Sequence, residues 1–183
     1  MAIRPIVEVP HPVLAARAAE VGEFNDDIRT LIDDLADTMY AAPGVGLAAP
    51  QVGAGLRVIV ADLDPASYEI PQSDEDVESR SLYAFVNPEI VEREGGCSME
   101  EGCLSVPDFT IDVPRFERIV VRGLDGDGQP LELELHGFPA VVLQHEIDHL
   151  DGVTLLDKVS GLKRRLYLKK QKKKQAHESL AAP

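Results

Sequence analysis

Two histidines stand four residues apart in the stretch Gln144-His145-Glu146-Ile147-Asp148-His149, and a glutamate directly follows the first of them. On an α-helix, residues i and i+4 lie on the same face, so both imidazoles can reach one metal ion. Glu146 then lies beside that ion without having to be a ligand. The pattern is typical of a hydrolytic metal site in which a carboxylate moves protons.

The same stretch also fits a buried helix whose histidines are hydrogen-bonded core residues. The flanks favour a helix in either case, because Pro139 suits a first helical position and Asp151-Gly152 offers a stop. A single histidine would favour the core interpretation, whereas the complete His-Glu-x-x-His pattern favours metal binding. The pattern names neither a third ligand nor a reaction, so both must come from other parts of the chain.

A loop of small residues at 41–53 contains one amide side chain, that of Gln51. Its glycines allow a ligand or another chain to approach the backbone closely. The Gln51 amide either holds the loop by a structural hydrogen bond or donates to an anionic oxygen, and the residues alone leave both roles open. The loop lacks the Gly-Lys-Ser/Thr ending of a phosphate-binding loop.

The two cysteines, Cys97 and Cys103, are six residues apart and do not match the Cys-x-x-Cys spacing of a zinc knuckle. One of them can still serve singly as a ligand. Cys103, in a Gly-Cys-Leu turn, is the better candidate, and Cys97 is expected to be an ordinary small residue. Two cysteines in 183 residues do not make a disulfide scaffold, so we expect a reducing, intracellular location.

The elements that must position these residues indicate one α+β domain. Asn25 can cap a helix in which apolar residues recur at helical spacing from Ile28 to Met39. Strands are predicted at residues 56–63, 82–86, 90–92, 118–124 and 131–135, with a break at Asn87-Pro88. Residues 64–81 indicate an acidic surface insertion. We therefore expect mostly antiparallel strands packed around a central metal-binding helix, with a C-terminal basic helix.

The net charge of −14 is unevenly distributed along the chain. Residues 158–183 hold nine Lys and Arg and one Glu, whereas residues 1–157 hold nine Lys and Arg and thirty-one Asp and Glu. A basic tail on an acidic body points to a polyanionic partner, or else to a solvated helix end. No apolar run approaches the roughly 20 residues of a membrane span, and residues 1–10 carry no signal-peptide pattern.

Three stretches taken together resemble the peptide deformylase family. They are Gly-Val-Gly-Leu-Ala-Ala-Pro-Gln at 44–51, Glu-Gly-Cys-Leu-Ser at 101–105 and the histidine stretch at 144–149. They stand in the family's order and at compatible spacing, and the likeness covers roughly residues 3–160. The acidic insertion departs from the common pattern, and residues 108–112 do not align with a known substrate-contacting stretch.

This resemblance implies that Cys103, His145 and His149 bind a metal. Ligand chemistry alone favours Zn²⁺, whereas the family implies Fe²⁺, with Zn²⁺, Ni²⁺ or Co²⁺ as alternatives. Glu146 takes a proton from the attacking water and delivers it to the departing amine. Developing charge on oxygen is stabilised by the Gln51 amide and the Leu104 backbone N–H, so the resemblance favours the catalytic role for Gln51. Asp148 is expected to be structural, and Glu101 is expected to pair with Arg115.

The implied substrate is an N-formylmethionyl peptide of a nascent polypeptide, which loses formate in N-terminal methionine processing during protein biosynthesis. The backbone of Val45, Gly46 and Leu47 is expected to meet the peptide. The methionine pocket is assigned to Phe138, Val141 and Val142. We expect a cytoplasmic enzyme with its catalytic domain at residues 1–160. The basic tail at 161–183 is expected to contact ribosomal RNA, and no membrane is involved.

Two other functions compete with this interpretation. An ordinary metallopeptidase would cut internal peptide bonds, but its usual third ligand follows the histidine pair, and no histidine stands at the metzincin spacing here. The other alternative is a ribosome-binding protein that has the fold of an enzyme but has lost its catalytic activity. Such a protein would need only the basic tail for its function. The intact Glu146, Gln51 and three candidate ligands argue against that loss of function.

Overall fold

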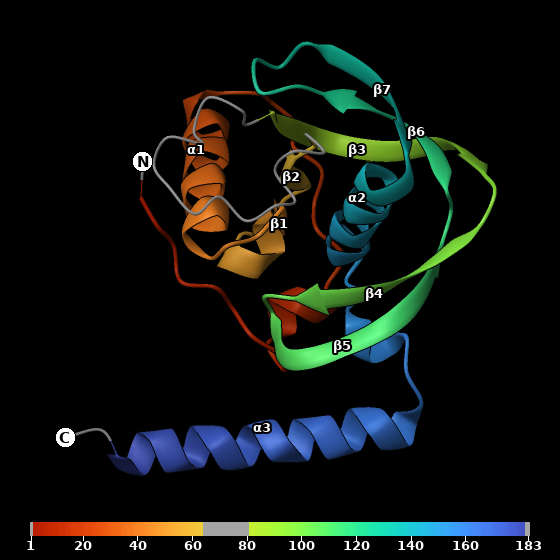
Figure 1. Cartoon of the computed structure of the whole chain (residues 1–183). Helices are drawn as coiled ribbons and strands as arrows, with labels where there is room; N and C mark the ends of the chain where they lie inside the picture. Colours follow the sequence, from red (N-terminus) through yellow and green to blue (C-terminus); the bar gives the residue numbers. More distant parts are fainter. Residues whose placement is uncertain (1, 64–80, 182–183) are drawn as a thin grey trace, which may run out of the picture.

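The computed structural model describes residues 2–63 and 81–181 of the chain. Seven strands and three α-helices form its main elements, joined by short 3-10 turns (Figure 1). Their bounds are α1 Asp26–Ala41, β1 Gly46–Ala48, β2 Val58–Asp62, β3 Leu82–Glu94, β4 Cys97–Cys103, β5 Val106–Arg115, β6 Arg118–Leu124, β7 Pro130–His136, α2 Gly137–Leu150 and α3 Gly161–Ala181. The segment predicted as an acidic insertion lies outside the described residues, except for Ser81.

The strands form two antiparallel sheets. Five strands pair in the order β1-β2-β3-β6-β7, and β4 pairs with β5 in a separate two-stranded sheet. β6 and β7 form the predicted hairpin, in which Asp125 Oδ1 accepts from the backbone N–H groups of Asp127 and Gln129. The expected fold class, α+β with mostly antiparallel strands around a central helix, is confirmed.

The predicted strand break at Asn87-Pro88 is wrong, because β3 runs through it. The ladder with β6 shifts register between Val86 and Glu89, and Asn87 takes a left-handed φ of 51°. The irregularity is therefore a bulge, held by hydrogen bonds between the Asn87 side chain and the backbone of Val21. Bulges bend a strand, and the far end of β3 leads through a turn at Gly95, with φ of 65°, into β4.

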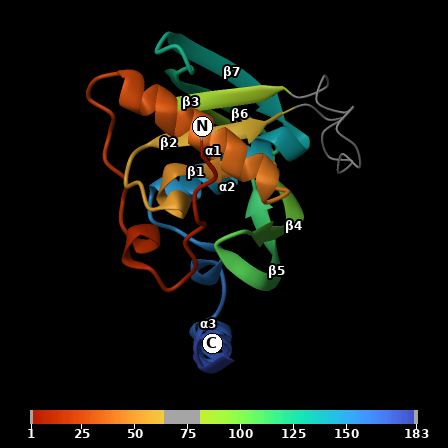
Figure 2. The ribbon, with the colours of Figure 1, turned by 90° about the vertical axis from the view of Figure 1, so that its left-hand side faces the viewer.

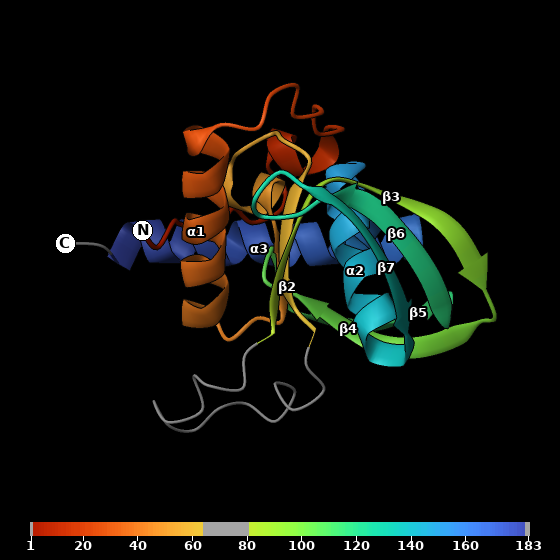
Figure 3. The ribbon, with the colours of Figure 1, turned by 90° about the horizontal axis from the view of Figure 1, so that it is seen from above.

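Helix α2 occupies the centre, between the larger sheet and the β4–β5 hairpin (Figures 1 and 3). Its apolar side chains pack into one core with strands β2, β3, β6 and β7. Nine of its fourteen residues are buried, which explains why its apolar character is not confined to one face. A helix enclosed in this way holds its functional side chains on a rigid support.

Helix α1 covers β1 and β2 and begins as predicted. The Asn25 side chain accepts hydrogen bonds from the backbone N–H groups of Asp27 and Ile28. The apolar residues predicted to form one face, from Ile28 to Met39, are buried against the strands. Arg4 and the backbone of Ala2 both bond to Asp34 of α1, which ties the N-terminal arm to this helix.

Helix α3 follows a 3-10 turn at Leu155–Asp157 and lies outside the compact body, beneath β5 (Figures 1 and 2). It confirms the expected basic helix. None of the described helices combines the length and the apolar character needed to cross a bilayer.

Candidate metal centre

The predicted histidine pair lies on one face of α2. The His145 and His149 rings have centroids 5.0 Å apart and meet edge to face. Gln144 locks this part of the helix, because its side chain accepts from the Phe116 N–H at 3.0 Å and donates to the Phe116 carbonyl at 2.8 Å. The predicted stop is also present, since Asp151 ends the helix and Gly152 takes a φ of 73°.

Cys103 reaches the same point from the end of β4. Its Sγ lies 3.2 Å from His149 Nε2. One ligand atom from each of Cys103, His145 and His149 falls within a group spanning at most 4.8 Å. The β4–β5 register skips here, so that Gly102 faces Thr110 whereas Cys103 faces Val106. This tight turn aims the thiol at α2, while Cys97 lies at the far end of β4 opposite Arg115.

The donor set suits a metal ion. One thiol and two imidazoles make three ligands, which leaves a fourth position for water or substrate in a tetrahedral site. His145 donates from Nδ1 to Glu101 Oε2 at 2.8 Å, so its Nε2 remains for an ion. In the described part of the chain, the buried Nδ1 of His149 has no hydrogen-bond partner.

The pKa values of His145 and His149 are shifted in opposite directions by the groups around each ring. Burial alone would lower the pKa of His145, but hydrogen bonds with Cys103 and Glu101 raise it to about 10. Burial lowers the pKa of His149 well below its usual value, and the charges of His145 and Arg115 act in the same direction. A bound cation would displace the His145 proton, because only neutral imidazole is a ligand.

A buried arginine holds the carboxylate behind His145. Arg115 donates from Nε and Nη2 to both oxygens of Glu101 at 2.7 and 2.9 Å, and from Nη1 to Asp148 at 2.6 Å. Burial works to raise the pKa of Glu101, but the hydrogen bonds from Arg115 and His145 hold it at about 2. The expected Glu101–Arg115 pair is thus confirmed, and it continues through Asp148 to Lys158 at 3.0 Å.

Glu146 lies next to the three candidate ligands and is 4% exposed. Burial raises the pKa of this carboxyl to about 7. Its Oε2 finds no hydrogen-bond partner among the described residues. Gly46 makes room for it, because a Cβ at this position would lie 2.6 Å from Glu146 Oε1. A carboxyl with a pKa near neutrality and a free oxygen can both accept and donate a proton.

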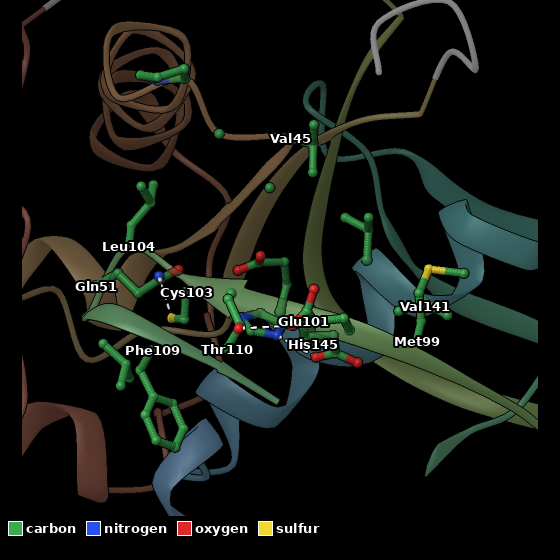
Figure 4. Close-up of a pocket in the computed structure, with 18 of the residues that line it drawn as sticks. Val45, Gln51, Met99, Glu101, Cys103, Leu104, Phe109, Thr110, Val141 and His145 are labelled. Atoms are coloured by element: carbon green, nitrogen blue, oxygen red, sulfur yellow. Dashed lines mark hydrogen bonds and ion pairs between the residues drawn. The ribbon is translucent and has the colours of Figure 1, made fainter. Parts of the chain in front are cut away.

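Of the two roles that its sequence context left open, the Gln51 side chain has the structural one in this structure. Its Oε1 accepts from the Ala48 backbone N–H at 2.8 Å, a structural bond that fixes the amide. Its Nε2 points at the Cys103 sulfur 3.7 Å away (Figure 4). The amide N–H groups therefore face the centre in a fixed orientation.

These groups line a cavity of about 610 Å³. Most of the residues predicted for the site contribute to its wall, namely Val45, Gly46, Gln51, Cys103, Leu104, Phe138, Val141, Val142, His145 and Glu146. Leu47 does not, because its side chain is fully buried in the core beneath α1. His149 is buried behind the wall, within reach of Cys103.

Sequence reasoning missed Met99, Phe109 and Thr110, which also line the cavity. All three belong to the β4–β5 hairpin, and neither of its strands was predicted. A signal was present in β5, where the buried Ile111 and Val113 alternate with exposed neighbours. Gly95 and Gly96 before β4, and Gly102 within it, concealed the first strand.

Comparisons with known proteins agree with one another. The family model described as polypeptide deformylase matches residues 3–165. The peptide deformylase of Thermodesulfovibrio yellowstonii is 48% identical over 174 residues, 95% of this chain and 99% of that protein. A crystal structure of a Legionella pneumophila peptide deformylase is 40% identical, with a TM-score of 0.84 and 100% coverage of both chains. The Ehrlichia chaffeensis enzyme in complex with actinonin is 38% identical, with a TM-score of 0.85 and coverage of 95% and 98%.

Proposed function

The chain belongs to the polypeptide deformylase family, and from this premise we propose how its residues remove the formyl group from the N-terminus of a formylated nascent peptide. The enzyme is a hydrolase, and its products are formate and a free amine. The observation that carries the assignment of roles is the convergence of Cys103, His145 and His149, with Cys103 and His145 at the wall of the cavity that Glu146 also lines.

We assign the metal to Cys103 Sγ and to the Nε2 atoms of His145 and His149. Fe²⁺ is the proposed native ion, with Zn²⁺, Ni²⁺ or Co²⁺ as alternatives. When bound, a divalent ion supplies Lewis-acid activation of water, which lowers its pKa from 15.7 towards roughly 7. Glu101 supports this set by fixing the ring of His145.

Glu146 is the proposed proton carrier. It accepts a proton from the water that attacks the formyl carbon, and it later donates this proton to the departing amine nitrogen. The C–N bond of the formamide breaks in that second step. The raised pKa of about 7 supports both halves of the cycle, because the carboxyl can hold and release a proton at neutral pH.

The developing negative charge on the formyl oxygen needs donors. We assign this role to the Gln51 amide and to the Leu104 backbone N–H. The bond from Ala48 to Gln51 Oε1 supports the assignment, because it leaves Nε2 directed at the centre without further reorganisation. Loss of one such donor costs on the order of 10²–10³ in turnover.

The methionine side chain of the substrate is assigned to the apolar part of the cavity formed by Phe138, Val141 and Val142, to which we add Met99. Val45 and Gly46 offer their backbone to the peptide. Leu47 offers only its backbone, since its side chain is buried beneath α1. β1 pairs with β2, and its other edge faces away from that partner, which suits an extended chain.

Formate release from formyl-Met-Ala tests the reaction, with an unformylated peptide as the competing substrate. We expect formate release and no peptide cleavage. Glu146→Ala should lower kcat by about 10²–10⁴ without loss of bound metal. Cleavage of the unformylated peptide would instead identify a metallopeptidase, and ribosome binding without either activity would identify the catalytically inactive ribosome-binding protein.

The metal is tested by purification without air. A thiolate beside Fe²⁺ predicts that activity follows the iron content and falls on exposure to oxygen. Equal activity with Zn²⁺ alone, and no dependence on iron, would contradict the assignment of Fe²⁺.

We also propose that the catalytic domain covers residues 1–160 and that the tail at 161–183 contacts ribosomal RNA in the cytoplasm. The exposed lysines of α3 support this, because phosphate contacts are made by such side chains. Replacing Lys169, Lys172 and Lys173 with glutamate should abolish co-sedimentation with ribosomes and spare hydrolysis of a free peptide. Unchanged co-sedimentation, or binding insensitive to salt, would reject the contact.

A further inference from the structure

Two side chains of α3 are buried although the helix lies outside the compact body. Among residues 161–174, only Tyr167 and Gln171 are classed as buried, with 8% and 2% exposure. They are one helical turn apart and therefore share a face. A buried glutamine on an exposed helix requires a specific polar partner, because an unpaired buried amide is costly.

That partner is the backbone carbonyl of Pro107. Tyr167 donates its hydroxyl to this oxygen at 2.8 Å, and Gln171 Nε2 donates to the same oxygen at 3.2 Å. Gln171 also donates to the Tyr167 hydroxyl at 2.9 Å, which closes the triangle. Pro107 is the second residue of β5, just after the turn that follows the candidate ligand Cys103, so α3 is fastened to the active-site hairpin.

Phe109, two residues after Pro107, extends this contact to the cavity. Phe109 lines the cavity wall, and its ring packs edge to face on Tyr167 with centroids 5.1 Å apart. The ammonium of Lys163 lies 5.0 Å above the same ring. Between Pro107 and Phe109, Asp108 takes a left-handed φ of 58°.

Phe109 and Leu104 lie at one end of the cavity, and Met99 and Val141 lie at the other (Figure 4). The methionine side chain is assigned to the second end. The substrate residues that follow methionine must therefore pass another part of the cavity wall. We take this part to be the Phe109 end, which packs against α3.

We propose that Tyr167 and Gln171 are positioning residues for peptide binding, which act through Pro107 and Phe109 on the wall that meets the substrate beyond its first residue. The inference rests on the proposed function. Tyr167 shares an apolar cluster with Cys103 and Phe109, but among the described residues neither Tyr167 nor Gln171 hydrogen-bonds to a candidate metal ligand or to Glu146. The proposal therefore places their effect on substrate affinity and not on the chemical step.

Steady-state kinetics on two substrates test this. Tyr167→Phe removes the hydroxyl and keeps the ring, and Gln171→Leu removes both amide donors. For a formylated tetrapeptide, each change should raise KM by about 2- to 10-fold with kcat and metal content unchanged. For formyl-Met-Ala the increase should be smaller. Leu162→Ala and Leu166→Ala, on the exposed face of the same helix, should change neither constant.

A double-mutant cycle separates positioning from general stabilisation. If Tyr167 acts through Phe109, Tyr167→Leu should raise KM in the wild-type background and have little effect in Phe109→Leu. Unchanged KM for the tetrapeptide in folded Tyr167→Phe/Gln171→Leu protein would overturn the proposal. A fall in kcat on both substrates with loss of metal would also overturn it. Failure of the proposed function differs from both, because the wild type would then release no formate.

Discussion

Two arginine-centred networks use the same residue types in different surroundings. Arg115 bonds to Glu101 and Asp148 between α2 and the β4–β5 hairpin, where the Arg115 and Glu101 side chains are only 5% and 6% exposed. Arg118 bonds to Glu134 at 2.9 Å and to Glu92 at 3.1 Å on the outer sheet surface, where these carboxylates are about half exposed or more. The hydrogen bonds of the two networks have similar lengths, but the two sets of side chains differ in their exposure to solvent.

The pKa values of the two glutamates do not reveal this difference. Hydrogen bonds from Arg118 and His136 hold the pKa of Glu134 at about 2, the same value to which Arg115 and His145 hold that of Glu101. In water, however, either partner of the exposed pair can be lost and the other solvated. In the interior, a lost partner leaves a charge that neither water nor protein compensates. Burial, and not the pKa shift, therefore ranks the two networks.

Removing the buried cation should have the largest effect. Arg115→Met leaves the buried Glu101 carboxylate without its arginine, whereas Asp148 keeps Lys158, so we expect a loss of about 3–5 kcal/mol in the free energy of unfolding. The ring of His145 also loses its fixed carboxylate, which should weaken metal binding by about 10- to 100-fold. Chemical denaturation and metal analysis measure the two effects. Stability equal to wild type would show that the interior tolerates the unpaired carboxylate.

The sequence predicted local parts of this site and missed the parts that depend on distant contacts. The histidine pair follows from helical spacing, and the Asn25 cap and the stop at Gly152 follow from residue type. Cys103 lies 42 residues before His145, and only the family resemblance placed it there. The Glu101–Arg115 pair was expected, but its burial and its link to Asp148 come from the tertiary packing of β5 on α2.

Dependence on distant contacts also explains which elements and contacts the sequence did not predict. The β4–β5 hairpin was not predicted, because its pairing skips register at Cys103 and because Gly95, Gly96 and Gly102 resemble loop sequence. The contact of Tyr167 and Gln171 with Pro107 spans 60 and 64 residues. A basic, charge-rich helix gives no sign of which of its residues will be buried. Asn87-Pro88 resembled a strand break because a single bulge and a strand end use the same residue types.

Acid should weaken the interior network by a smaller amount. The folded pKa of Glu101 is about 2 and its unfolded value is about 4.3, so its stabilising contribution is present above the unfolded value and is lost as the pH falls towards 2. The contribution is on the order of 2–3 kcal/mol. Unfolding of chelated wild type and Glu101→Gln should differ at about pH 6, differ about half as much at about pH 3, and converge below about pH 2. A constant difference would mean that Glu101 is not ionised in the fold.

Asp148 is the point at which the interior network reaches solvent, and its removal should cost less again. Its side chain is 24% exposed and bonds to both Arg115 and Lys158. Asp148→Asn keeps a hydrogen-bond acceptor for Arg115, so we expect a loss of about 1 kcal/mol in the free energy of unfolding. Metal content should not change, because Glu101 still holds His145. Metal loss would show that Asp148 positions the ligand through Arg115.

The exposed network should give the smallest effect and is the matched control for Arg115. Arg118→Met leaves the carboxylates of Glu92 and Glu134 hydrated, so the free energy of unfolding should fall far less than for Arg115→Met, and formate release should not change. Any difference that remains at low ionic strength should vanish in about 1 M salt, where the Debye length is about 3 Å. Salt cannot screen the Arg115–Glu101 pair in this way, because both of these side chains are buried. If both variants lost the same free energy of unfolding, and salt did not change that loss, burial would not be the property that distinguishes the two networks.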